Sequence, residues 1–107
     1  MLKHATHTAA VVLVVLFASL TSLAQNSGAD TYKAKCQMCH GAAGLGDTPA
    51  GKAMAAIPFN STDVVKASDA NLTAIIKSGK NKMPSFTGKL TDAQIKDVLT
   101  YIRTLQK

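Results

Sequence analysis

The chain has 107 residues, a length that suits one small domain. Its 12 lysine and arginine residues outnumber its six acidic residues, all of them aspartate, so the net charge is +6. This surplus favours acidic partners or anionic surfaces. Nucleic acid is disfavoured as a partner, because the chain has no basic stripe with interleaved aromatic residues.

The first 24 residues have the layout of a secretory signal peptide. Residues 1–8 carry one lysine and no acid, residues 9–20 (AAVVLVVLFASL) form an apolar run, and Ser22-Leu23-Ala24 offers small residues for cleavage. The apolar run is shorter than the ~20 residues that cross a bilayer. We therefore expect a cleaved signal and a secreted domain over residues 25–107, with an uncleaved membrane tether as the alternative.

The mature chain begins with a polar linker, residues 25–29, and then becomes helical from Asp30. Tyr32, Cys36 and Cys39 fall on one face of that helix, at spacings of four and three residues. The run Cys36-Gln37-Met38-Cys39-His40 has the C-x-x-C-H pattern that attaches c-type haem. Its spacing lets two thiols bond the haem vinyl groups while the imidazole of His40 takes an axial position on iron.

Two other readings of this motif are weaker. A thioredoxin-like redox pair would lie beside a βαβ pattern, and the chain has no strand-like runs. A structural zinc site needs about four ligands, whereas the mature chain has two cysteines and one histidine. A chance match to the motif is the remaining alternative.

Beyond this motif, the chain resembles the monohaem class I cytochromes c of bacterial periplasms. The resemblance extends from Gly28 to Leu105, and it rests on the attachment motif and on Gly28, Tyr32, residues 41–51 (GAAGLGDTPAG), residues 79–86 (GKNKMPSF) and Tyr101-Ile102-Arg103. It implies an all-α fold of three to five short helices wrapped around one covalently bound haem. A mature domain this small buries only about 60% of its unfolded surface, so we expect the haem to complete its core.

We expect the middle of the chain to be irregular, with short helices. Residues 41–51 hold four glycines and one proline, so we expect a loop around the proximal edge of the haem. Residues 52–56 favour a single helical turn. Ser61 or Thr62 suits the N-cap of another short helix that ends near Val65.

Residues 68–79 have the signals of a complete helix. Ser68 suits the N-cap, and Gly79 suits the left-handed position that follows a helix. The apolar positions share one face, which we expect to line the distal side of the haem, and they are Leu72, Ile75 and Ile76.

Residues 90–107 contain the clearest helix. Thr91 and Gln94 fit a capping box. We expect this helix to cross the N-terminal one near Leu99 or Tyr101, with its lysines and Arg103 as solvated surface. Its apolar positions follow the helical period and are Ile95, Val98, Leu99, Ile102 and Leu105.

The resemblance implies the axial ligands of the haem iron, His40 and Met83. Pro84 favours an extended conformation at Met83, which suits a thioether presented from a loop. Methionine opposite histidine is the ligation of electron-transfer cytochromes. Met54 is the rival sixth ligand, although it follows His40 closely; Met38 lies inside the attachment motif, on the proximal side.

The resemblance also assigns two supporting roles. The carbonyl of Pro49 would accept a hydrogen bond from the second nitrogen of His40, which orients a ligating imidazole; a plain turn proline is the alternative. Gly28 would let the N-terminal helix approach the C-terminal one closely, and a linker glycine is the alternative.

We therefore expect a soluble periplasmic electron carrier with one haem c, attached through Cys36 and Cys39, and no enzymatic activity, because both axial positions are filled. The expected partners are redox proteins with acidic patches or membrane-bound respiratory complexes, and the expected form is a monomer. Two alternatives remain: a haem-containing subunit of a membrane dehydrogenase or oxidase, and a haem sensor or weak peroxidase from which Met83 dissociates. Exposed lysines would surround the haem edge, namely Lys33, Lys35, Lys52, Lys80, Lys82 and Lys89.

Overall fold

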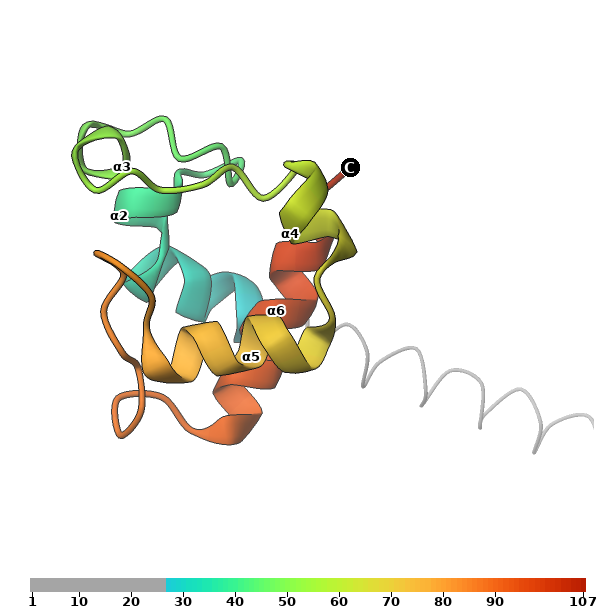
Figure 1. Ribbon diagram of the computed structural model, residues 1–107. Helices are drawn as coiled ribbons and strands as arrows, with labels where there is room; N and C mark the ends of the chain where they lie inside the picture. Colours follow the sequence, from blue (N-terminus) through green and yellow to red (C-terminus); the bar gives the residue numbers. More distant parts are fainter. Residues whose placement is uncertain (1–26) are drawn as a thin grey trace, which may run out of the picture.

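The computed structural model describes residues 27–107, so the expected signal peptide and the first residues of the expected linker lie outside the described part. The described chain is helical and has no strands beyond two isolated bridges, which confirms the all-α expectation (Figure 1). None of its helices is long and apolar enough to cross a membrane. A helical segment at residues 27–35 precedes α2 (Gln37–His40), α3 (Pro49–Ala53), α4 (Thr62–Lys66), α5 (Asp69–Ser78) and α6 (Asp92–Thr104).

The core lies where helical residues 27–35 meet α6. Tyr32, Ile95 and Val98 are the most deeply buried large side chains, each at most 1% exposed. Because apolar side chains recur along α6 at the helical period, one face of that helix is buried along its whole length. The buried cluster also includes Phe59, Ile76, Phe86, Leu90 and Ile102.

Gly28 lies at the close approach between residues 27–35 and α6. It is buried, and a Cβ atom there would overlap the backbone carbonyl of Asp97 and lie 3.1 Å from Cβ of Tyr101. The close-packing role is therefore confirmed and the linker reading of residues 27–29 was wrong. Those residues are already helical, because packing Gly28 against α6 outweighs the weak helix propensity of glycine.

The two long helices begin as expected, whereas Gly79 after α5 has the expected positive φ but a ψ of 168°, outside the left-handed helical conformation. The hydroxyl of Ser68 accepts a hydrogen bond from the backbone N–H of Asn71 at 3.1 Å, and Gly79 follows α5 with φ +76°. Thr91 and Gln94 form the capping box of α6, with hydrogen bonds of 2.8 and 3.1 Å. Ile76 of α5 is buried, whereas Leu72 and Ile75 are half-buried.

The loop after His40 contains more regular structure than its glycines suggested. α3 begins at Pro49, because proline is favourable at the first helical position and the hydroxyl of Thr48 accepts the N–H of Gly51 at 2.9 Å. The expected helical turn at residues 52–56 thus starts three residues earlier. α4 follows Ser61 as its N-cap, close to the expected position.

Residues 79–90 cross back from α5 to α6 without a helix. The segment is held against the end of α5: the N–H groups of Phe86 and Thr87 donate to the carbonyls of Ile76 and Lys77, both at 3.1 Å. The hydroxyls of Ser85 and Thr87 also donate to the Lys77 carbonyl, at 2.5 and 2.7 Å. This loop, which carries Met83, is therefore fixed at its C-terminal half.

Arg103 is a structural residue, so the expectation that it is solvated surface was wrong. Its guanidinium donates to Oδ1 of Asp69 at 3.0 and 2.8 Å and to the carbonyls of Ala67 and Val64 at 2.6 and 3.3 Å. These bonds join the connection between α4 and α5 to the C-terminal end of α6. Nothing in the periodicity of α6 distinguishes such an arginine from an exposed one.

We predict that Gly28→Ala destabilises the haem-loaded protein by about 1–3 kcal/mol, because the added methyl group must push residues 27–35 away from α6. Chemical denaturation would measure the change. Ser27→Ala is the control, since Ser27 is exposed on the same helical segment and should change stability by less than about 0.5 kcal/mol. Similar effects of the two substitutions would contradict the close-packing role.

Candidate functional site

Cys36, Cys39 and His40 lie together where residues 27–35 pass into α2 (Figure 1). One continuous helix through both cysteines was expected, but the chain turns at Cys36, with φ −121° and ψ −36°. The backbone N–H of His40 still donates to the carbonyl of Cys36 at 3.0 Å, so the three side chains stay on one short turn. Both thiols are free and half-buried.

The surroundings favour the uncharged forms of Cys36 and His40. Burial, with a smaller contribution from Cys39, raises the pKa of the Cys36 thiol to about 11. Burial lowers the pKa of His40, because it disfavours the charged imidazolium. A neutral imidazole is the form of histidine that binds a metal.

Two hydroxyl groups hold the backbone on either side of His40. The buried Tyr32 hydroxyl donates to the carbonyl of Gly41 at 2.6 Å, and burial raises the pKa of this tyrosine well above its usual value. The Thr48 hydroxyl donates to the carbonyls of Met38 and Cys39, at 2.6 and 3.1 Å. The carbonyls of Met38, Cys39 and Gly41 are therefore satisfied by side chains that lie outside the motif, and the His40 carbonyl accepts from the backbone N–H of Gly46 at 2.8 Å.

The His40 ring stacks on Phe59, with ring centroids 4.6 Å apart and an interplanar angle of 25°. Its Nδ1 atom is buried and has no hydrogen-bond partner within residues 27–107. The expected hydrogen bond to the Pro49 carbonyl is thus not formed here, and Pro49 is an exposed first residue of α3. Nothing local in the sequence links Phe59 to a histidine 19 residues earlier, so this stacking could not be predicted.

Met83 lies in the loop between α5 and α6, half-buried and packed against the same core cluster as Cys36. The other methionines of the described chain differ in exposure: Met38 is 77% and Met54 is 50% exposed. The neighbouring Lys82 reaches the carbonyl of Ala53 at the end of α3, at 3.4 Å. The Met83 loop is thus close to the segment that follows His40.

The donor groups suit a haem better than a bare metal ion. Nowhere in residues 27–107 do three histidine, cysteine or acidic side chains gather as metal ligands. Haem c uses an imidazole, a thioether and two thiols; here the Cys36 thiol and the Met83 thioether pack on one apolar cluster, the His40 ring stacks on Phe59 of that cluster, and Cys39 is a second free thiol on the same turn. Nδ1 of the stacked His40 ring is buried and has no hydrogen-bond partner in the described chain. These residues fit haem c.

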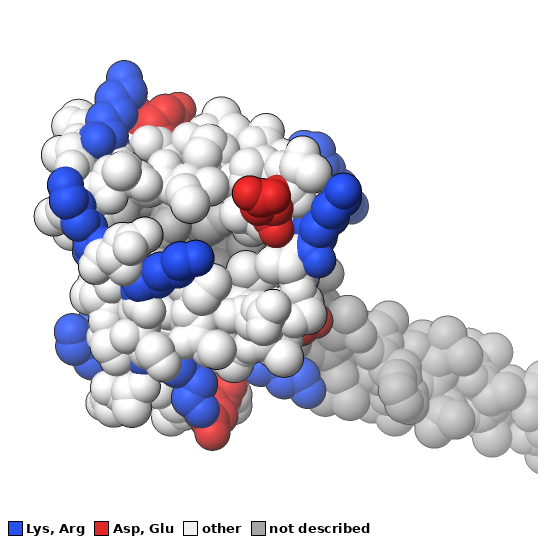
Figure 2. All heavy atoms as spheres, in the orientation of Figure 1, with Lys and Arg blue, Asp and Glu red and all other residues white. Residues whose placement is uncertain are grey.

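The surface near the site is basic. All six lysines expected to surround the haem edge are exposed. Figure 2 shows basic side chains around the rim of one face, where acidic side chains are fewer. The lysines closest to Met83 in the chain are Lys80 and Lys82.

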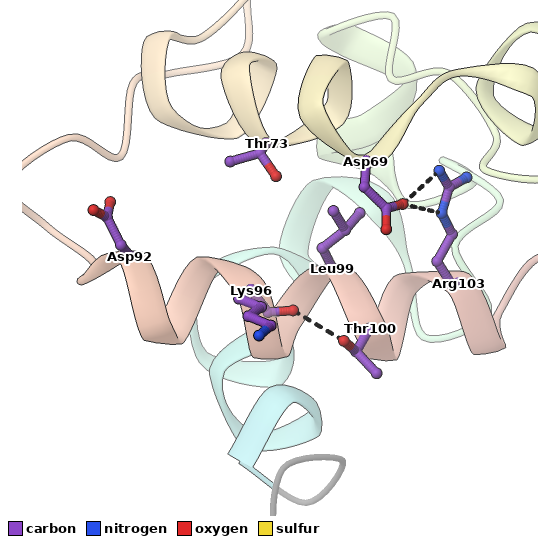
Figure 3. Close-up of a pocket in the computed structure, with 7 residues that line it drawn as sticks. All are labelled: Asp69, Thr73, Asp92, Lys96, Leu99, Thr100 and Arg103. Atoms are coloured by element: carbon purple, nitrogen blue, oxygen red, sulfur yellow. Dashed lines mark hydrogen bonds and ion pairs between the residues drawn. The ribbon is translucent and has the colours of Figure 1, made fainter. Parts of the chain in front are cut away.

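A pocket of about 450 Å³ lies elsewhere, between α5 and α6 (Figure 3). Its charged lining includes Asp69 and Arg103, which pair with each other, and Asp92, which pairs with Lys77 at 3.0 Å. It contains none of the cysteine, histidine or methionine residues discussed above. Its charges therefore stabilise the contact between the two helices.

We predict that Tyr32→Phe destabilises the haem-loaded protein by about 1–2 kcal/mol, because it leaves the buried Gly41 carbonyl without its donor. Tyr101→Phe is the matched control, since the Tyr101 hydroxyl makes no hydrogen bond within the described chain. Denaturant titration of both variants tests this. Equal stability losses would show that the hydrogen bond beside His40 is unimportant.

Comparison with known proteins supports the same assignment. Residues 23–102 match the family described as cytochrome C oxidase, cbb3-type, subunit III. The chain is 35% identical to cytochrome c6 of Leptolyngbya boryana over 78 residues, which cover 71% of this chain and 86% of that protein. It is 31% identical to cytochrome c6 of Thermostichus vulcanus over 99 residues, which cover 85% of this chain and 82% of that protein.

A third relative is cytochrome c6 of Pyropia yezoensis, which is 31% identical over 96 residues, or 83% of this chain and 79% of that protein. No solved structure matches the chain at a significant level. The family match spans the attachment motif, the Met83 loop and most of α6. The all-α fold, the C-x-x-C-H turn and these relatives together show that the chain belongs to the monohaem class I cytochromes c.

Proposed function

We propose that this protein is a periplasmic electron carrier. It would hold one haem c through thioether bonds from Cys36 and Cys39, with His40 and Met83 as the axial ligands. The observation that carries the proposal is the placement of Cys36 and Met83 against one apolar cluster, which brings donors 47 residues apart to the same part of the core. The relatives named cytochrome c6 support the same class of function.

When bound, the haem supplies an iron that cycles between Fe(II) and Fe(III). The role of the polypeptide is to bind the haem and to exclude other ligands from the iron. His40 offers a neutral imidazole, because burial lowers its pKa. Met83 offers a soft thioether from a loop anchored to the end of α5, and His/Met ligation raises the reduction potential. With His40 and Met83 both bound to the iron, no site would remain for a substrate, so we propose no catalytic activity.

The proposed location follows from the signal-peptide pattern of residues 1–24, which would be cleaved to leave a periplasmic domain at residues 25–107. The proposed partners are redox proteins with acidic docking patches. We propose that this protein meets them as a monomer. A brief encounter suits electron transfer, because such complexes have small interfaces and rapid exchange.

A second candidate is a haem-bearing subunit of a membrane oxidase, favoured by the description of the matching family. In that case the protein would copurify with membranes after a high-salt wash, and its partner would be fixed rather than transient. If osmotic shock instead releases the protein, and the released protein reduces or oxidises partners in solution, that result would support the electron-carrier function.

We predict that Met83→Ala opens the iron to small molecules. The reduced variant should bind carbon monoxide rapidly at neutral pH, because the thioether no longer occupies the sixth position. Wild type and Met54→Ala should bind it slowly, since Met54 is half exposed. Flash photolysis or stopped-flow absorbance measures the rates.

Rapid binding of carbon monoxide by the wild type would instead favour a sensor or weak peroxidase. Rapid binding by Met54→Ala alone would make Met54 the ligand.

We also predict that electron transfer with a natural partner slows as salt rises. A basic surface that steers an acidic partner should lose about tenfold in rate between ~0.01 M and ~0.15 M salt, as the Debye length shortens. Lys80→Glu should lower the low-salt rate more than Lys66→Glu. Both lysines are exposed, but Lys80 lies in the Met83 loop, whereas Lys66 lies on α4, on the opposite side in Figure 1.

Stopped-flow kinetics at several ionic strengths would test this. A rate that does not depend on salt, or equal effects of the two substitutions, would contradict steering by these lysines.

A further inference from the structure

The C-terminal end of α5 is held by the loop that follows it, drawn in orange in Figure 1. A helix leaves its last four carbonyl groups without partners inside the helix. Here the Lys77 carbonyl accepts three hydrogen bonds, from the hydroxyls of Ser85 and Thr87 at 2.5 and 2.7 Å and from the backbone N–H of Thr87 at 3.1 Å. The Ser85 hydroxyl also accepts that N–H, at 3.3 Å. Two side-chain hydroxyls thus join this part of the loop to the end of the helix.

Met83 lies two residues before the first of these hydroxyls, and its backbone is also held on the other side. Its N–H donates to the carbonyl of Lys80 at 2.9 Å, and its carbonyl accepts from the N–H of Lys80 at 3.3 Å. A Cβ atom on Gly79 would lie 2.6 Å from the Met83 carbonyl oxygen, so the two backbones are in contact. Pro84, the residue between Met83 and Ser85, has a fixed φ. We therefore expect a large displacement of Met83 to disturb the hydrogen bonds of Ser85.

We propose that Ser85 and Thr87 are positioning residues that keep Met83 on the haem iron. This inference rests on the proposed function, in which Met83 is an axial ligand. A loop opens locally at a free-energy cost that depends on the contacts it loses. Each hydroxyl bond to the Lys77 carbonyl adds to that cost, so it lowers the fraction of molecules in which the loop is open. The two hydroxyls thus control how readily an external ligand replaces the Met83 thioether.

A merely structural role of the two hydroxyls would give a different result. If they only satisfied the end of α5, their removal would lower the free energy of unfolding without changing ligand exchange at the iron. Ser85 and Thr87 are exposed, so their substitution leaves the buried cluster in place. Thr104 is the matched control. It is also exposed, and its hydroxyl donates to the Tyr101 carbonyl at 2.6 Å, at the opposite end of α6 from the Met83 loop.

The experiment adds imidazole to the haem-loaded, oxidised protein and follows the near-infrared sulfur-to-iron absorption band, which disappears when the thioether leaves. Because imidazole binds only molecules with an open loop, its apparent affinity scales with the open fraction. Ser85→Ala and Thr87→Val should each raise that affinity by about three- to tenfold, the effect of losing one hydrogen bond. The double variant should exceed both. Thr104→Val should bind imidazole as the wild type does, and so should Thr87→Ser, because it keeps the hydroxyl.

Wild-type imidazole affinity in the double variant would overturn the inference, and so would an equal increase in Thr104→Val. An increase in Thr87→Ser as large as that in Thr87→Val would also overturn it, because the hydroxyl would then not be responsible. If the double variant does not take up haem, the two single variants decide. Failure of the proposed function would look different: the wild type itself would lack the near-infrared band, or Met83→Ala would keep it.

Discussion

The packing of residues 27–35 against α6 is the contact on which the rest of the structure depends. Tyr32 lies at its centre, and its hydroxyl fixes the backbone directly after His40. The same contact buries α6, whose N-terminus begins where the Met83 loop ends. The position of the C-x-x-C-H turn is therefore set by the packing of the segment just before it on a helix from the opposite end of the sequence, with Gly28 allowing the close approach.

Under the proposed function, the haem is part of the core. The domain is small, and its buried apolar side chains are few, so the protein part alone buries a limited share of its unfolded surface. Apolar area also remains exposed, without cover, because Met54 and Ile57 are 50% and 55% exposed and Leu72 and Ile75 are half-buried. A bound porphyrin would supply that cover, as metals and disulfides do in other small domains.

The helix ends and the attachment turn could be predicted because their signals are local. Ser68, Thr91 and the C-x-x-C-H spacing each act within a few residues. The role of Arg103, the break at Cys36 and the stacking of Phe59 on His40 depend on contacts between distant segments. Periodicity shows which face of a helix is apolar, but not which distant carbonyl an arginine will reach or which ring will meet a histidine.

The account depends most on the claim that the polypeptide needs the haem to fold. The direct measurement is the unfolding of a Cys36→Ala/Cys39→Ala protein shown by absorbance to be free of haem, followed by near-ultraviolet circular dichroism during denaturation. We predict residual helix but no cooperative transition and no fixed aromatic signal, whereas the haem-loaded wild type unfolds in one transition. A cooperative transition of the haem-free chain would contradict the account.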